Sequence, residues 1–179
     1  LVEGAVDLAP VYFVAGNHEA WSGKNKLIRE SLEGAGVQVL DDKKIVLEKN
    51  SQSIEILGLS DPNFLISSYR QEVDTSSLEA SLNRLSDEES FQILLSHRPE
   101  LIDIYAREKI DLIFSGHAHG GQFRLPFIGG LVAPDQGLNP KYTSGIHRMG
   151  NSTLVVSRGI GNSVIPVRIF NRPEIILLT

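Results

Sequence analysis

Four of the five histidines in this chain of 179 residues follow directly after apolar segments. They are His18 in "GNHE", His97 in "SHRPE", and His117 and His119 in "SGHAHGGQ". Neutral imidazoles suit Zn, Mn, Fe or Ni ions, and an amide oxygen such as that of Asn17 suits a harder ion. One histidine alone is more simply explained by a structural hydrogen bond than by metal binding. For His147 no nearby motif suggests metal binding, so we expect a structural or surface role. The group of four favours a metal site.

The apolar segments before these clusters are expected to be strands. Buried-type strands are predicted at residues 11–16, 91–96 and 110–116, each ending where a polar cluster begins. In α/β sheets, sites form in the crevice outside the carboxyl ends of the strands. We therefore expect the clusters to converge, with the His-x-His pair extended so that both rings leave the same side of the backbone.

The remaining segments complete an alternating pattern of strands and helices. Apolar residues at helical spacing predict helices over residues 24–33, 76–87 and 99–108. Residues 17–21 and 61–76 are expected to be loops. Further strands are predicted at residues 37–40, 44–49, 53–60, 153–159, 164–170 and 174–179, the last three in a second sheet. The economical interpretation is one α/β domain over residues 1–179 with a β-rich ending.

Composition excludes several classes of function. The formal charge of −5 and the pI near 5.5 argue against a surface built to bind nucleic acid or anionic membrane, which needs clustered lysine and arginine. The absence of cysteine excludes disulfides, thiolate catalysis and cysteine-type zinc sites. Any metal must therefore be held by histidine, carboxylate or amide groups.

Other readings of the polar clusters have weaker support. The "GGQ" stretch suggests a phosphate-binding glycine loop, but it lacks the Walker spacing and its lysine. Ser96 beside His97 suggests a serine nucleophile, yet no G-x-S-x-G elbow occurs. Arg98 could contact a phosphate, but we expect it, like Asp61 and Asp135, in a loop or at the solvent surface.

Three motifs, "GNHE", "LLSHRPE" and "DLIFSGHAHGGQ", occur in this order and resemble the distal motifs of the calcineurin-like metallophosphoesterase superfamily. The ending "SRGIG…VIPVRIFNRPEIILLT" resembles the bacterial YkuE-like branch. The resemblance extends over nearly the whole chain. It implies a four-layer α/β/β/α sandwich of two mixed sheets and a phosphoesterase that uses two divalent ions, with Mn, Fe or Zn expected.

The resemblance also implies a role for each matched residue. Asn17, His97 and His117 would bind one ion, His119 would bind the other, and His18 would donate a proton to the leaving group or stabilise the phosphoryl charge. Two cations can clamp phosphoryl oxygens and lower the pKa of a shared water. An imidazole can supply a proton near neutral pH. Because the metals carry positive charge, an acidic chain can still bind phosphate.

The chain departs from the superfamily pattern before "GNHE". Neither the expected Asp-x-His nor an intact Gly-Asp-x-x-Asp/Glu motif occurs, and the opening "LVEG" looks like the remainder of "GDLVEG". We therefore expect a carboxy-terminal portion of a phosphoesterase domain, missing the first strands and their helix. Only one ligand of the second ion is present, so we expect this chain alone to hold a single metal.

Two hypotheses about function follow. In the first, the intact protein hydrolyses a phosphate ester or pyrophosphate bond in a phosphorylated small molecule or lipid-linked substrate. It would be cytoplasmic or membrane-associated, with any membrane contact made through an upstream segment. In the second, the chain is a noncatalytic metal- or phosphate-binding fragment. Pocket walls are expected from residues 60–75 and 123–145, which carry no recognisable code for a substrate.

Overall fold

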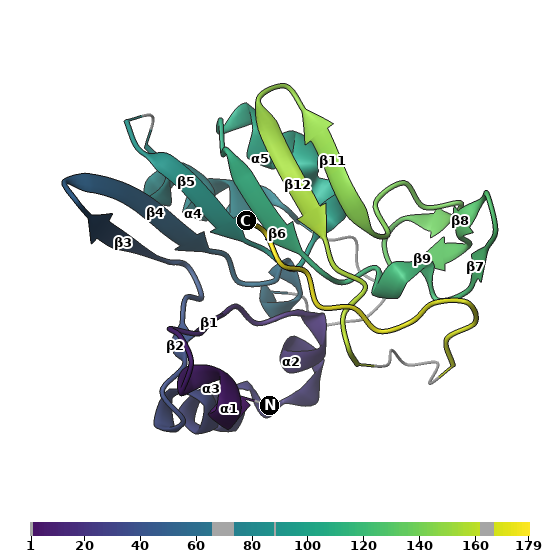
Figure 1. Ribbon diagram of the computed structural model, residues 1–179, viewed down its shortest axis with the longest axis horizontal. Coiled ribbons are helices and arrows are strands. Elements are labelled where there is room, and N and C mark those ends of the chain that lie inside the picture. Colours follow the sequence, from purple (N-terminus) through teal and green to yellow (C-terminus); the bar gives the residue numbers. More distant parts are fainter. Residues whose placement is uncertain (1, 66–73, 88, 162–166) are drawn as a thin grey trace. The chain divides into compact units, whose positions relative to one another are not determined.

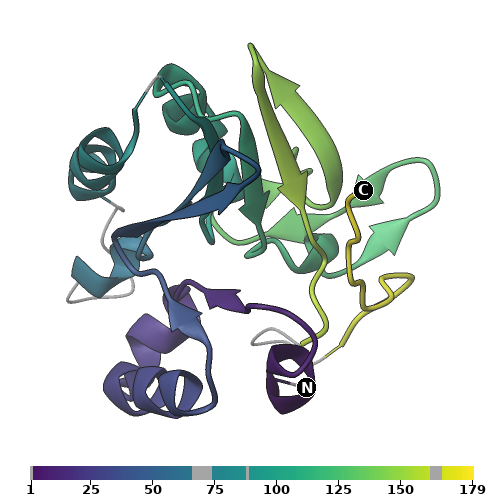
Figure 2. The ribbon, with the colours of Figure 1, turned by 60° about the vertical axis from the view of Figure 1, so that its left-hand side comes forward.

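The computed structural model describes residues 2–65, 74–87, 89–161 and 167–179. It contains two compact units, Leu1–His97 and Arg98–Thr179. Figures 1 and 2 show the elements from two directions. The α/β class predicted from the sequence is confirmed, because each unit combines helices with a mixed sheet. The single domain over residues 1–179 stays a prediction.

The unit Leu1–His97 contains three paired strands of mixed direction. Its elements are β3 (Lys43–Lys49), β4 (Gln52–Gly58), α4 (Ser76–Leu85) and β5 (Phe91–Leu95). β3 is antiparallel to β4, and β4 is parallel to β5. Asn50 and Ser51 both have positive φ, as a two-residue hairpin turn of this kind requires. Helix α4 lies behind β4 and β5 in Figure 1 and buries its three leucines, Leu78, Leu82 and Leu85.

The amino-terminal part of this unit holds a second, smaller strand pair. Its elements are α1 (Val2–Val6), β1 (Tyr12–Phe13), α2 (Asn17–Ser22), α3 (Asn25–Gly34) and β2 (Gln38–Val39). β1 and β2 are parallel, and α3 contacts both β2 and α2. The loop expected at residues 17–21 is wrong, because Asn17–Ser22 forms helix α2. The Gly16 N–H donates to the Glu19 carboxylate (2.8 Å), which supports this helix start.

The unit Arg98–Thr179 contains three paired strands of mixed direction in the order β11-β12-β6. Its elements are the 3₁₀ turn η2 (Pro99–Leu101), α5 (Ile102–Arg107), β6 (Leu112–Ser115), β11 (Gly145–Met149) and β12 (Ser152–Val156). β12 is parallel to β6 and antiparallel to β11. Helix α5 contacts β11 and β12 and lies behind them in Figure 1. Tyr105, Ile113 and Leu154 are fully buried in this unit.

Short hairpins fill the segment between β6 and β11. β7 (Arg124–Leu125) pairs with β8 (Gly129–Gly130), and β9 (Val132–Ala133) pairs with β10 (Gly137–Leu138). This segment was expected to be loop, and β11 had not been predicted. Both short pairs lie close in sequence to the "HAHGGQ" turn, and β8 and β9 contact it.

The sequence predicts a second sheet at the end of the chain. In the part of this segment that the structure describes, that prediction is wrong. Residues 153–159 contribute β12 to the sheet with β6, and residues 164–166 lie outside the described part of the chain. Residues 174–179 form no regular strand, and the described tail pairs only through an isolated bridge between Phe123 and Ile169. Ile175 and Leu177 remain 80% and 85% exposed, so the apolar pattern of the tail is not matched by burial there.

Among the residues that the structure describes, no helix is long and apolar enough to cross a membrane.

Candidate metal centre

Asn17 and His97, both expected to bind one ion, lie together in the unit Leu1–His97. Asn17 is the first residue of α2, the element that follows β1 in the chain, and His97 lies two residues after the end of β5. The His97 Nε2 atom lies 2.8 Å from Asn17 Oδ1. Two ligand atoms that are each about 2.1 Å from one ion are about 3.0 Å apart in adjacent octahedral positions and about 3.4 Å apart in tetrahedral ones. In this structure the two atoms lie at hydrogen-bond distance, and an imidazole nitrogen and an amide oxygen are both ligand types that suit a divalent ion.

Gly16 makes this approach of His97 sterically feasible. A Cβ atom at position 16 would lie 2.8 Å from three atoms of the His97 ring. Such a contact is shorter than packed side chains tolerate. The backbone at Gly16 is extended, so the requirement for glycine comes from this close approach rather than from its dihedral angles. The glycine of "GNHE" thus lets the ring of His97 lie against the main chain.

His18 projects differently from its neighbour Asn17. Asn17 is 3% exposed, whereas His18 is exposed and its ring lies 5.6 Å from the ring of Trp21, one helical turn away. Adjacent residues on a helix point in different directions, so one can be buried while the other remains accessible. This arrangement agrees with a residue that does not share the ligand role of Asn17. The proton-donor role of His18 stays a prediction.

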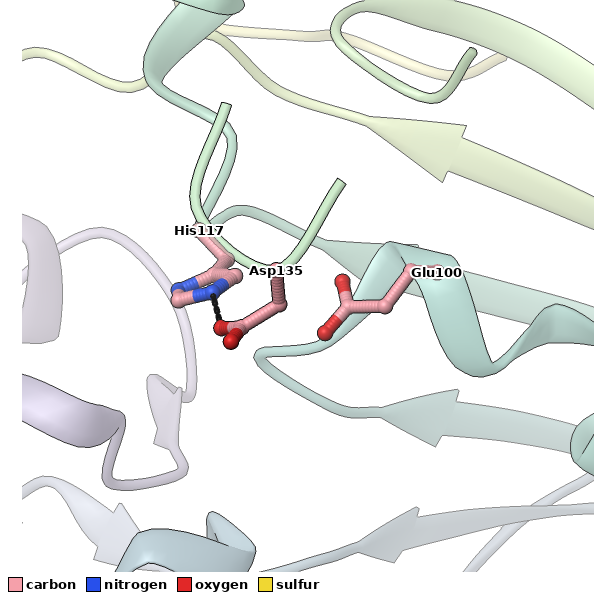
Figure 3. A group of neighbouring side chains, drawn as sticks. All are labelled: Glu100, His117 and Asp135. Atoms are coloured by element: carbon pink, nitrogen blue, oxygen red, sulfur yellow. Dashed lines mark hydrogen bonds and ion pairs between the residues drawn. The ribbon is translucent and has the colours of Figure 1, made fainter. Parts of the chain in front are cut away.

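His117 lies in a charged cluster of the unit Arg98–Thr179. It follows β6, is 3% exposed, and has its Nε2 atom 2.7 Å from Asp135 Oδ2. Figure 3 shows the ring facing this carboxylate, with the Glu100 carboxylate directed toward the same place. Each of these three residues offers one potential ligand atom, and the three atoms lie within 4.8 Å of one another. The chemistry of the three donors would suit a cation.

Arg98 already supplies positive charge to this cluster. Its guanidinium donates to the Asp135 carboxylate and, at 3.3 Å, to Glu100. The hydrogen bond from His117 and the charge of Arg98 hold the pKa of Asp135 below its usual value against the effect of burial. Burial raises the pKa of Glu100, and the charge of Arg98 opposes that rise only in part. A metal bound by both carboxylates would meet the like charge of Arg98.

The turn that carries His117 and His119 is not extended, so the expected extended His-x-His geometry is wrong. His117 and His119 have φ of 57° and 46°, on either side of a right-handed Ala118. The chain tightens into the 3₁₀ turn η3 (His119–Gly121), where Gly121 N–H donates to the Ala118 carbonyl (2.7 Å). Left-handed non-glycine residues are sterically unfavourable and are concentrated at functional sites.

Asn171 holds the far side of this turn from the carboxy-terminal tail. Its Nδ2 donates to the carbonyl oxygens of His119 (2.6 Å) and Gln122 (3.2 Å). A Cβ on Gly120 would clash with the Asn171 amide, and Gly120 has φ of 68°. Asn171 is 3% exposed. The tail therefore fixes the backbone of the segment that presents His119.

Sequence reasoning missed the contacts of four residues of these arrangements, namely Arg98, Glu100, Asp135 and Asn171. Arg98 was expected to be exposed to solvent, but it is only 1% exposed. Asp61 lies in an irregular segment, as expected for a loop residue, although it is only 2% exposed. Asp61 accepts from the Asn63 N–H (2.9 Å) at the start of the 3₁₀ turn η1 (Pro62–Leu65). Asp135, Glu100 and Asn171 carried no motif that marked them. The one available signal was the closeness in sequence of Arg98 and Glu100 to His97.

Comparison with known proteins identifies the family. The family model described as "Calcineurin-like phosphoesterase" matches residues 1–121, which include all five predicted site residues. The chain belongs to the calcineurin-like phosphoesterase family. Phosphodiesterase YaeI of Escherichia coli is 32% identical over 174 residues, which cover 96% of this chain and 58% of YaeI. The uncharacterized metallophosphoesterase YkuE of Bacillus subtilis is 40% identical over 101 residues, which cover 56% of this chain and 34% of YkuE.

A solved structure supports the fold. SoxB, a sulfate thiohydrolase of Termus thermophilus solved with glycerol, matches 87% of this chain and 29% of its own chain with a TM-score of 0.51. At 18% identity this likeness concerns the fold alone. Membership in the calcineurin-like phosphoesterase family supports metal-dependent hydrolysis of phosphoester bonds in general and implies divalent metal ions.

The predicted ligands fall in different units of this calcineurin-like phosphoesterase chain. Asn17 and His97 belong to Leu1–His97, and His117 and His119 belong to Arg98–Thr179. The structure brings the first two together and places His117 with Asp135 and Glu100. Convergence of all four ligands stays a prediction.

Proposed function

We propose that the intact protein hydrolyses a phosphate ester or pyrophosphate bond at a dinuclear metal centre. The observation that carries this proposal is the 2.8 Å approach of His97 Nε2 to Asn17 Oδ1, permitted by Gly16 within the matched family region. Divalent ions in such a centre polarise phosphoryl oxygens and lower the pKa of a water molecule. The residues of the chain hold these ions and position the substrate beside them.

Each predicted residue has one task in this proposal. Asn17, His97 and His117 hold one ion, and His119 contributes to the other. His18 donates a proton to the leaving oxygen, for which an exposed imidazole on the first turn of α2 is suited. The neighbouring Asn17 stays buried, so proton donation and ion binding use separate side chains of one motif.

A phosphodiester is the first substrate class to test. The printed name of the Escherichia coli relative is a phosphodiesterase, and that relative is similar over 96% of this chain. The physiological substrate in this proposal is a phosphorylated small molecule or a lipid-linked phosphate.

A noncatalytic role for this chain alone is the second candidate. It is favoured by the length of the match, because the chain spans 58% of YaeI. With His119 as the one predicted ligand of the second ion, the chain by itself would bind one metal and turn over slowly or not at all.

Hydrolysis of a chromogenic phosphodiester with added Mn²⁺ tests both candidates. The assay compares this chain of 179 residues with the longest protein that its gene encodes, each as wild type, His97→Ala and His147→Ala. His147 is a suitable control because its Nε2 bonds to the Ser144 carbonyl (3.1 Å) outside the predicted ligand set. Of these two substitutions, we expect only His97→Ala to abolish turnover, while His147→Ala keeps the activity of wild type. Inactivity of the longest wild-type protein with Mn²⁺, Fe²⁺ and Zn²⁺ would reject the enzymatic function.

A further inference from the structure

The hydrogen bond between His117 and Asp135 defines which nitrogen of the ring carries the proton. His117 Nε2 lies 2.7 Å from Asp135 Oδ2. An ionised carboxylate only accepts hydrogen bonds, so the ring atom that faces it is the donor. A neutral imidazole has one donor and one acceptor. With the proton on Nε2, Nδ1 is the ring nitrogen that carries a lone pair.

The Asp135 carboxylate is itself held in place. Asp135 lies in the turn between β9 and β10, and the buried guanidinium of Arg98 donates to it. Arg98 is anchored in turn, because the buried Tyr105 hydroxyl donates to its carbonyl oxygen (2.8 Å). These contacts all lie within the unit Arg98–Thr179. The acceptor that faces the His117 ring therefore belongs to a connected network.

Direct binding of a metal by Asp135 competes with this arrangement. The oxygen of Asp135 that accepts from His117 also accepts from Arg98, so an ion bound there would displace one of the two hydrogen bonds. It would also stand beside the guanidinium, and close like charges repel strongly in a buried environment. The charges of the cluster therefore favour a role in which Asp135 holds the His117 ring by a hydrogen bond over one in which Glu100 and Asp135 bind the metal directly.

We propose that Asp135 is a positioning residue that holds the His117 ring with its proton on Nε2 and presents Nδ1 to a divalent ion. The proposal rests on the proposed function, because it takes His117 as a metal ligand. Metal-binding histidines generally donate their second ring N–H to a carboxylate or carbonyl group, and loss of that partner lowers metal affinity by about 10- to 100-fold. No sequence motif assigns this role to Asp135.

The tautomer of His117 gives a test that needs neither metal nor activity. In long-range ¹H–¹⁵N spectra of the full protein without metal, we expect His117 to carry its proton on Nε2. In Asp135→Asn this preference should be lost, and in Asp103→Asn, an exposed acidic residue on α5, it should be kept. A wild-type proton on Nδ1, or an unchanged tautomer in Asp135→Asn, would overturn the proposal.

Calorimetric titration with Mn²⁺ gives the second measurement. We expect Asp135→Asn to weaken Mn²⁺ binding about 10- to 100-fold, while Asp103→Asn leaves it unchanged. Equal and complete loss of binding in Asp135→Asn and Glu100→Gln would indicate direct coordination and overturn the positioning role. If wild type hydrolyses substrate but Asp135→Asn binds Mn²⁺ normally, the proposal fails and the proposed function stands. If wild type binds no metal, the proposed function fails, and with it the metal-binding role of Nδ1.

Discussion

The imidazole ring of His97 lies directly against the main chain at Gly16. A Cβ atom there would lie 2.8 Å from three ring atoms, and the same ring reaches Asn17 Oδ1 at 2.8 Å. The glycine and asparagine of "GNHE" therefore act on one histidine that lies far away in the sequence. The His97 ring that requires the space at Gly16 is thus the same ring that contacts Asn17.

Gly16→Ala should damage this arrangement without removing any ligand. The added methyl group must push the His97 ring away, and overpacking of this kind costs about 1–3 kcal/mol. We expect a fall of this size in the free energy of unfolding, measured by urea denaturation, together with weaker Mn²⁺ binding. Gly4→Ala is the matched control, since a Cβ at Gly4 would meet nothing within 4 Å. An unchanged Mn²⁺ affinity in Gly16→Ala would contradict the prediction.

Metal binding and proton donation should separate between two histidines. His117→Ala should lose bound metal and activity together, because it removes a predicted ligand. His18→Ala should retain metal and lose about 10²- to 10⁴-fold in turnover, the usual contribution of a general acid. Metal content by mass spectrometry and kcat with a chromogenic phosphodiester check both variants. Equal metal loss in the two variants would refute the role assigned to His18.

The contact between Asn171 and the His119 turn should be important for stability. Asn171→Ala removes the donor of two hydrogen bonds, to the carbonyl oxygens of His119 and Gln122, and each such bond contributes about 0.5–1.5 kcal/mol, or about 1–3 kcal/mol for both. We expect that loss in the free energy of unfolding, measured in urea. Arg172→Ala, at the exposed neighbouring residue, is the control. Equal stability of Asn171→Ala and wild type would show that the tail does not hold the turn.

The buried carboxyl of Asp41 should make stability fall with pH in the acidic range. Burial raises its pKa, while the hydrogen bond from the Ala15 N–H (2.8 Å) and the charge of Arg29 oppose this rise. Between the usual aspartate pKa and the raised one, the folded state binds more protons than the unfolded state. The contribution of Asp41 to stability is therefore greatest below this window and is lost as pH rises through it.

Asp41→Asn isolates that contribution, because asparagine does not titrate. The unfolding free energy of wild type minus that of Asp41→Asn should decrease as pH rises from about 3.5 through the window just above the ordinary aspartate pKa. Urea denaturation at a series of pH values provides this difference, in which the other carboxyl groups largely cancel. A difference that increases with pH would show that the hydrogen bond and Arg29 outweigh burial.

The sequence by itself determined the class of the fold and the family, and it predicted the residue types of the metal site. Strands such as β4 and β5 and helix α4 follow from local hydrophobic periodicity, which a single sequence contains. "GNHE", "SHRPE" and "SGHAHGGQ" likewise carry their chemistry in adjacent residues. The structure then brought two of the predicted ligands, Asn17 and His97, within hydrogen-bond distance.

Tertiary structure alone decided which residues surround these motifs. Arg98 is buried because Asp135 and Glu100 satisfy its charge, and Asn171 is placed on the His119 turn by the path of the tail. Residues 174–179 form no strand despite their apolar sequence, because a strand requires a partner edge as well as suitable side chains. Burial, charge pairing and strand pairing depend on contacts between residues that are distant in sequence. A local sequence pattern does not contain information about which distant residues become neighbours.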